Sequence, residues 1–194
     1  MKELLVKYMA KYTSLTEEEQ RAVLEDIYLE EYKKGTVLLR QGDVPTNCYF
    51  VLQGCVRQYL IHESGKEVTI NFYTEEQAIT SINAHKQDKS SEYTFTCLED
   101  TVLVVGELAV EKDMFRKYGQ LESLTRQMVE EKFSQVQDEY AAFIASTPEE
   151  RFKALLRNRP GLIDRVPQHQ LASYLGITPE SLSRIKKRVH QDKE

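Results

Sequence analysis

A short stretch near the end of the chain, residues 166–189, constrains the fold more than any other. Within each predicted helix its apolar residues recur every three or four positions, as in two crossed helices that share a small core. The apolar residues of the stretch are Leu171, Leu175, Ile177, Leu182 and Ile185. Ala172 is small where the second helix must approach the first. Gly176 stands where the chain must turn, through a backbone conformation that a side chain would penalise. The stretch predicts a helix-turn-helix unit.

The start of the second helix is marked by Thr178 and Pro179. A threonine side chain can accept a hydrogen bond from the free N–H groups of the first turn, and a proline there leaves no N–H unpaired. Leu182, Ile185 and Val189 then form the buried side of this helix.

The opposite side of the second helix is polar, with Glu180, Ser183, Arg184 and Lys187 projecting. An arginine can donate twice to guanine and a glutamate can accept from the cytosine amino group, so Arg184 and Glu180 are suited to contact bases. The expected phosphate contacts are Gln168, Thr178, Lys186, Lys187 and Arg188. The alternative is a helical hairpin that packs against the rest of the protein and leaves a charged face in solvent.

Charge is divided unevenly along the chain. Residues 151–194 hold ten Lys or Arg against four Asp or Glu and so carry +6, while the whole chain carries −5. The first 150 residues therefore carry −11. A basic end joined to an acidic remainder fits local attraction to DNA phosphates, with weak nonspecific adsorption elsewhere.

Length and composition fit a globular protein with one ordinary domain and one small one: 194 residues, 41% hydrophobic and 29% charged. No apolar run approaches the length of a membrane span, and charges interrupt the first residues, so we expect a cytoplasmic protein without a membrane partner. Cys48, Cys55 and Cys97 are odd in number and not closely paired, which argues against a disulfide framework and a cysteine-bound metal.

Short strands are predicted between about residues 29 and 105, after a helix that opens at residues 15–19. Segments rich in β-branched and aromatic residues alternate there with turn signals; they are VLL, CYFVL, VRQYLI, VTINFY, YTFTCL and VLVV. Many short strands in so short a span indicate an antiparallel barrel or jelly roll.

Helical periodicity returns from about residue 107 to 145, with a break near residues 118–119. Within it lies a heptad seam, which needs a partner helix; its residues are Val129, Phe133, Val136, Tyr140 and Phe143. We favour a second copy of the chain as that partner, and the alternative is that the seam packs on the barrel of its own chain. Residues 146–150 then predict a helix stop and a capped new start, and so a hinge.

This order of elements resembles the CRP/FNR family of bacterial transcription regulators. In the roll the resemblance depends on Gly42-Asp43, residues 49–52, Gly54 and Gly65, and at the other end on LASYLGITPESLSRI. There Glu180, Ser183 and Arg184 fall on the positions from which such proteins contact bases, in an arrangement closer to the FNR branch.

The resemblance implies an α+β fold in three parts. A cyclic-nucleotide-binding-like β-roll with N-terminal helices spans residues 1–117, a dimerisation helix residues 118–146, and the helix-turn-helix domain residues 147–194. It also implies a homodimer that binds a near-palindromic site on double-stranded DNA and contacts RNA polymerase.

The nucleotide pocket departs from the family pattern. A Gly-Glu-Leu turn and an arginine hold the phosphate in cyclic-nucleotide binders, but here residues 76–82 are EQAITSI and no arginine occurs from residue 68 to 115. Burying a phosphate there without a cation is costly, so cyclic AMP is not the expected effector. An unknown small molecule near Phe72, Tyr73, Tyr93 and Thr94, or no ligand, is the alternative.

Two other functions are weighed against DNA binding. A cupin-like metalloenzyme needs converging histidines, and the roll offers only His62 and His85, so we expect no enzyme activity, metal or cofactor. A ligand-binding regulatory protein that has lost DNA binding is the other, and the intact helix-turn-helix motif argues against it.

Overall fold

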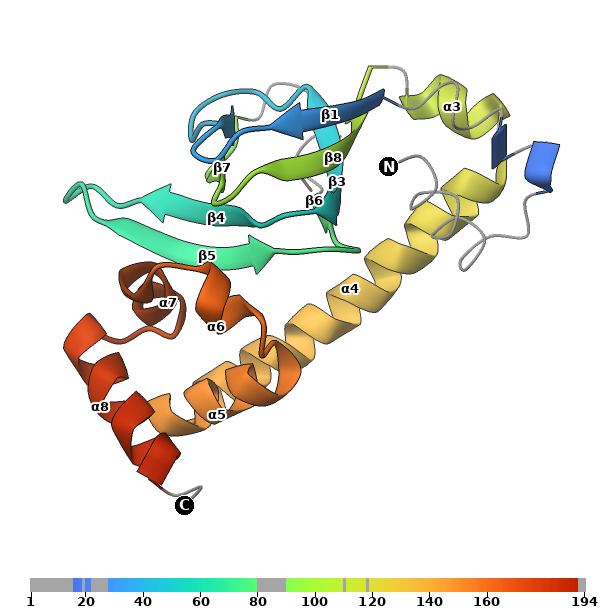
Figure 1. The fold of residues 1–194 in the computed structure, drawn as a ribbon. Coiled ribbons are helices and arrows are strands. Elements are labelled where there is room, and N and C mark those ends of the chain that lie inside the picture. The colour runs from blue at the N-terminus through green and yellow to red at the C-terminus, as the bar shows by residue number, and fades with distance from the viewer. Residues whose placement is uncertain are drawn as a thin grey trace.

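The computed structural model describes residues 16–18, 20–21, 28–79, 90–109, 111–117 and 119–191. In this part of the chain a β-roll is followed by a long helix and then by a group of shorter helices (Figure 1). The fold is α+β, as the sequence predicted. Most of the predicted N-terminal helix lies outside the described residues, although Glu17, Glu18, Gln20 and Arg21 are helical.

The described strands of the roll form two antiparallel sheets, in the orders β1-β8-β3-β6 and β2-β7-β4-β5. They are β1 (Tyr28–Tyr32), β2 (Val37–Leu39), β3 (Asn47–Gln53), β4 (Val56–Ile61), β5 (Glu67–Tyr73), β6 (Ala78–Ile79), β7 (Thr94–Cys97) and β8 (Thr101–Glu107). Each of the six predicted strand segments overlaps one of them. β1 and β6 match none of those segments, and the two residues of β6 are too few to show an alternating pattern.

Side chains from both sheets meet in the core of the roll. This core consists of Val51, Val56, Ile79, Phe95, Cys97, Leu103 and Val105. All three cysteines are free thiols, with Cys55 and Cys97 fully buried. Burial raises the pKa of the Cys55 thiol to about 12, so it stays neutral.

The turn between β3 and β4 requires a glycine. Gly54 has a φ of +111°, and a Cβ there would lie 2.7 Å from the Cα of Thr101. The N–H of Gly54 also donates to Glu75 Oε1 at 2.9 Å. The β3–β4 turn, the start of β8 and the β5–β6 turn therefore pack closely together.

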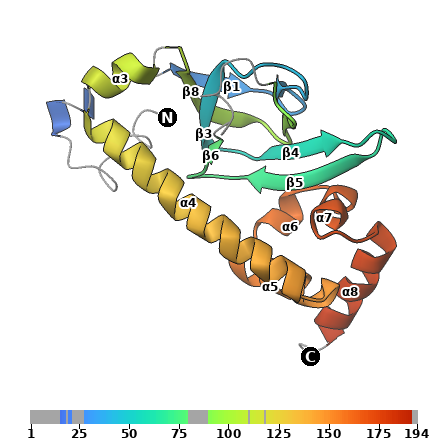
Figure 2. The ribbon, with the colours of Figure 1, turned by 180° about the vertical axis from the view of Figure 1, so that it is seen from behind.

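Two helices follow the roll, α3 (Glu111–Lys117) and α4 (Gly119–Ala145), and the break between them falls where it was predicted. α4 passes along one side of the roll and ends beside the C-terminal helices (Figures 1 and 2). Among the described residues, no helix has the length and apolar character needed to cross a bilayer.

The C-terminal helices pack around one buried cluster, and two residues of the roll, Cys55 and Phe72, belong to that cluster. These helices are α5 (Pro148–Asn158), α6 (Leu162–Arg165), α7 (Gln168–Tyr174) and α8 (Pro179–Gln191). α5 begins at the capped start predicted after the hinge, because Thr147 and Glu150 form a reciprocal capping box.

We predict that Gly54→Ala lowers the free energy of unfolding by about 2–4 kcal/mol. The alanine would have to adopt a left-handed backbone conformation, and its Cβ would clash with Thr101. Gly35→Ala is the matched control, because Gly35 also has a positive φ (+87°) but a Cβ there meets nothing within 4 Å. Gly35→Ala should lower the free energy of unfolding by only about 1–2 kcal/mol, the cost of the left-handed backbone alone. Urea denaturation of the full chain measures the free energy of unfolding of both variants. An equal decrease in the two would contradict the close approach of Gly54 to Thr101.

Candidate nucleic-acid interface

The helix-turn-helix unit consists of α7, α8 and the turn between them. Leu171, Ala172 and Leu182 are fully buried, and Leu175 and Ile185 are nearly so. The N–H of Ile177 donates to the carbonyl of Ala172 at 3.0 Å, which closes the turn. The apolar spacing in the sequence therefore corresponds to a small shared core.

Gly176 adopts the predicted left-handed conformation, with a φ of +69°. A Cβ there would lie 3.3 Å from Cζ of Phe143 and 3.4 Å from Nη1 of Arg151. The turn of the unit thus contacts the end of α4, a contact that the local sequence pattern does not reveal.

The start of α8 is capped as predicted. The N–H of Ser181 donates to Oγ1 of Thr178 at 3.2 Å, and Pro179 occupies the first helical position. Leu182, Ile185 and Val189 are buried on one side of α8. This side fixes the rotation of the helix and so determines which residues face solvent.

The four residues predicted to project from α8 are all exposed: Glu180, Ser183, Arg184 and Lys187. Hydrogen bonds from its own N–H and from the Thr178 hydroxyl lower the pKa of Glu180, which therefore remains an ionised acceptor near neutral pH. Nη2 of Arg184 lies 3.5 Å from Oγ of Ser181. The guanidinium of Arg184 is exposed beside this weak contact.

The predicted phosphate contacts differ in their surroundings. Gln168, Thr178 and Lys187 are exposed, whereas Lys186 is half-buried. Arg188 is exposed but forms an ion pair with Glu149 at 3.2 Å.

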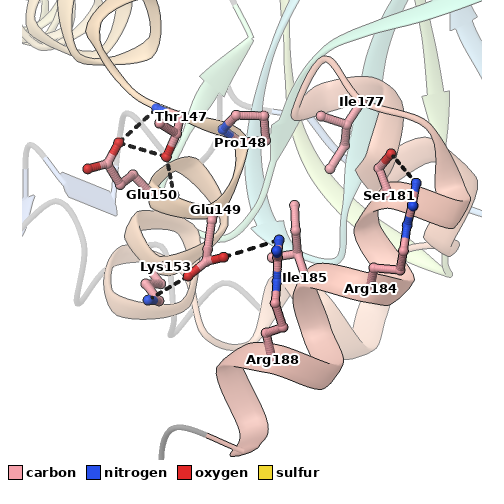
Figure 3. A pocket seen from close by; sticks show the side chains of 10 residues that line it. All are labelled: Thr147, Pro148, Glu149, Glu150, Lys153, Ile177, Ser181, Arg184, Ile185 and Arg188. Atoms are coloured by element: carbon pink, nitrogen blue, oxygen red, sulfur yellow. Dashed lines mark hydrogen bonds and ion pairs between the residues drawn. The ribbon is translucent and has the colours of Figure 1, made fainter.

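Figure 3 shows the open cleft that contains this ion pair, between the first turn of α5 and the side of α8 that carries Arg184 and Arg188. Glu149 also binds Lys153 at 2.9 Å, and this contact is the main cause of the lowered pKa of its carboxyl group. The Glu149–Arg188 pair is not predictable from the sequence, because its members lie on different helices and no spacing rule relates them.

The heptad seam on α4 is exposed in the single chain. Its five side chains are between 39% and 67% exposed, with Tyr140 the most exposed and Phe143 the least. Phe143 is partly covered by Arg151, whose guanidinium carbon lies 3.7 Å from the ring centroid. The same guanidinium donates to the carbonyls of Phe143 and Leu175, so it joins the end of the seam to the helix-turn-helix unit.

The four residues proposed for an effector pocket do not lie together. Tyr73 and Tyr93 pack against the core of the roll, and the buried Oγ1 of Thr94 accepts from the N–H of Gln41. Phe72 points to the opposite face of the sheet, where its ring meets Tyr174 of α7 edge-on at 5.4 Å. Strand alternation explains the separation, because neighbouring residues on β5 face opposite sides.

Burial raises the pKa of Tyr73, and its hydroxyl donates to Oε1 of Gln58 at 3.0 Å.

Among the described residues no group of three or more His, Cys, Asp or Glu side chains is placed to bind a metal ion. His62 lies exposed beside Ser64 in the β4–β5 turn, and His85 falls outside the described residues.

Comparison with known proteins agrees with this architecture. Residues 29–118 match the cyclic nucleotide-binding domain family. The global regulator CLP of Xanthomonas campestris, described as responsive to c-di-GMP, superposes with a TM-score of 0.71 at 13% identity, over 89% of this chain and 91% of that one. FixK2 of Bradyrhizobium japonicum gives 0.69 at 18% identity, over 86% of each chain.

A protein from Eubacterium rectale assigned to the CRP/FNR family gives a TM-score of 0.67 at 18% identity, over 94% of this chain and 88% of that one. The chain has the CRP/FNR fold. Its roll is similar to the cyclic nucleotide-binding domain family, and CLP and the Eubacterium rectale protein are each described as regulators. A comparison with curated protein sequences gave no match.

Proposed function

We propose that this CRP/FNR-type chain is a homodimeric transcription regulator that binds a near-palindromic DNA site. The observation that carries the proposal is the division of α8 into a buried side and an exposed polar side. Leu182, Ile185 and Val189 hold the helix in place, and Glu180 and Arg184 face solvent as base contacts require.

The local charge supports the same function. Residues 151–194 carry +6 within a chain of −5, so attraction to phosphates is concentrated where α8 lies. The resemblance further implies RNA polymerase as a partner of the bound regulator.

The exposed seam on α4 supports assembly through a second copy of the chain. The alternative, that the seam packs on its own roll, is disfavoured because Phe133 and Tyr140 are 63% and 67% exposed. A dimer with two recognition helices roughly 34 Å apart would contact successive major grooves on one side of the DNA.

The composition of the roll does not favour a cyclic nucleotide as effector. Arg57 is the arginine closest in sequence to the pocket segments, but it pairs with Glu67 at 2.6 Å and with Thr69 at 3.0 Å. It lies on the same face as Phe72, its cross-strand partner, and so points away from the core of the roll. We propose that the effector, if the protein uses one, is another small molecule that contacts Tyr73, Tyr93 or Thr94.

A regulatory protein without DNA binding remains the second candidate, since the roll alone could carry a ligand response. DNA binding by the purified chain distinguishes the two. A cupin-like enzyme lacks support in the described residues, where no group of three or more His, Cys, Asp or Glu side chains is placed to bind a metal ion.

Two substitutions on α8 test base contact against phosphate contact. Arg184→Ala should cost about 1–3 kcal/mol on the cognate site and relax the preference at one base position per half-site. Lys187→Ala should weaken binding to cognate and unrelated DNA equally. It should also make the plot of log binding constant against log salt concentration less steep by about one per subunit. Each variant serves as the control for the other, because both remove one exposed cation from the same helix.

Titrations of single-base variants of the site over a range of salt concentrations measure both effects. An unchanged base preference in Arg184→Ala would contradict the proposed contact face even if the protein binds DNA.

Assembly is tested on α4. Phe133→Asp places a charge in the seam and should convert the dimer to a monomer at micromolar concentration, with a corresponding loss of DNA affinity. Ser134→Asp introduces the same charge on an exposed position beside the seam and should leave the dimer intact. Sedimentation measures both, and a wild-type chain that sediments as a monomer would refute the assembly.

Isothermal calorimetry with cyclic AMP and cyclic GMP tests the effector proposal. No heat of binding is expected at micromolar nucleotide, because the pocket segments supply no arginine for the phosphate. A micromolar dissociation constant for either nucleotide would show that a cation reaches the pocket from elsewhere in the chain.

A further inference from the structure

The C-terminal helices are attached to the roll at a site separate from the hinge. Arg165, the last residue of α6, donates from Nη1 to Oε2 of Glu75 at 2.8 Å and from Nη2 to Oε1 of the same carboxylate at 2.9 Å. Its Nε donates to Oε1 of Glu99 at 3.1 Å, and Nη2 reaches the same oxygen. One guanidinium thus binds two turns of the roll, β5–β6 and β7–β8.

The carboxylate of Glu75 is itself held in place. It accepts from the N–H of Gly54, in the glycine turn between β3 and β4. Burial raises the pKa of Glu75, but the hydrogen bonds from Arg165 and Gly54 outweigh burial and leave that pKa below its ordinary value. The group therefore remains a charged acceptor near neutral pH.

Two further contacts lie along β5, which among the described strands pairs only with β4. The N–H of Thr69 donates to Oγ of Ser173 at 2.9 Å, and Nη2 of Arg159 donates to the carbonyl of Phe72 at 2.6 Å. Side chains of the C-terminal helices therefore satisfy backbone groups of an edge strand, which otherwise has unpaired hydrogen-bonding groups.

This attachment combines the apolar packing of Cys55 and Phe72 with polar contacts, and some of its buried polar groups lack a hydrogen-bond partner. Oε1 of Gln170 is buried without a hydrogen-bond partner, one turn before Ser173 and Tyr174 on the side of α7 that faces the sheet. Oγ1 of Thr96, the cross-strand partner of Arg57 on the same face, is also buried and unpaired. Unsatisfied buried polar groups oppose docking, so the apolar packing and the charged contacts together must offset them.

We propose that Arg165, Glu75 and Glu99 form a latch that positions the helix-turn-helix unit in the dimer and so sets the spacing between the two DNA half-sites. The proposal rests on the proposed function, because spacing has meaning only for a DNA-binding dimer. Arg151 joins the unit to the end of α4, and the latch joins it to the roll. Without the latch the unit is still held along β5 by Ser173 and Arg159, but it can pivot about residues 146–147. The latch and Arg151 together fix the direction of α8 relative to the seam.

Arg165 acts as a positioning residue in this account, since it lies on α6 and not on the exposed face of α8. The core of the unit does not depend on it, because Leu171, Leu182 and Ile185 pack among the C-terminal helices themselves. Loss of the latch should therefore leave the preference within each half-site unchanged.

The test compares Arg165→Gln with Glu75→Gln, which break the latch from opposite sides. Glutamine at position 75 retains an oxygen that can accept from Gly54, so the roll turn is preserved. Arg157→Gln is the matched control, because Arg157 is exposed on α5 and its loss removes the same charge. The double variant Arg165→Gln with Glu75→Gln should change each measured quantity no more than either single variant does, as expected for partners in one interaction.

The first measurement needs no DNA. Hydrogen exchange of the Thr69 amide in the full chain should accelerate by roughly tenfold or more in both latch variants, the factor for one lost hydrogen bond to a charged group. It should stay at the wild-type rate in Arg157→Gln. If the Thr69 amide exchanged at the wild-type rate in both latch variants, the proposal would be overturned whether or not the protein binds DNA.

The second measurement uses palindromic sites whose half-sites are moved apart or together by one and two base pairs. The wild type and Arg157→Gln should bind the site with one spacing most tightly. The latch variants should bind the sites of different spacing with more similar affinities, and their base preference within each half-site should be unchanged. A wild-type spacing profile in the latch variants would overturn the positioning role. A wild-type chain that binds none of the sites would refute the proposed function, while the exchange result would still decide whether the latch exists.

Discussion

Burial of one side of α8 is the constraint on which the rest of the account depends. Leu182, Ile185 and Val189 are each at most 4% exposed, and burying three such side chains stabilises the unit by several kcal/mol, at about 1.5–3 kcal/mol each. This burial fixes the helix about its own axis, so the polar residues between these positions must project outward. The caps at Thr178 and Thr147 then define where α8 and α5 begin.

The same unit is connected mechanically to both other parts of the chain. Arg151 lies over Phe143 and donates to Leu175, so the end of the exposed seam and the helix-turn-helix turn cannot move independently. Arg165 connects the unit to two turns of the roll. Two acidic side chains of the roll thus meet one arginine of the C-terminal helices, which gives the uneven charge along the sequence a structural role beyond attraction to DNA.

Local patterns were sufficient to predict much of this structure, and contacts between distant segments were not predictable. The spacing of Leu171, Leu182 and Ile185 predicted a shared core, and Gly176 predicted a left-handed turn, because both depend on short-range geometry. The pairs Arg165–Glu75 and Arg188–Glu149 join segments whose separation follows no periodic rule. Phe72 was grouped with Tyr73 by sequence position, although alternation along β5 places its ring on α7 instead.

Selection from random double-stranded DNA is the sharpest test of DNA binding by a dimer of this chain through α8. The purified full chain would be used without added ligand, and the bound sequences determined after several rounds. The account predicts enrichment of an inverted repeat with one fixed spacing between its half-sites. No enrichment over the starting pool, or enrichment of single half-sites without a repeat, would contradict it.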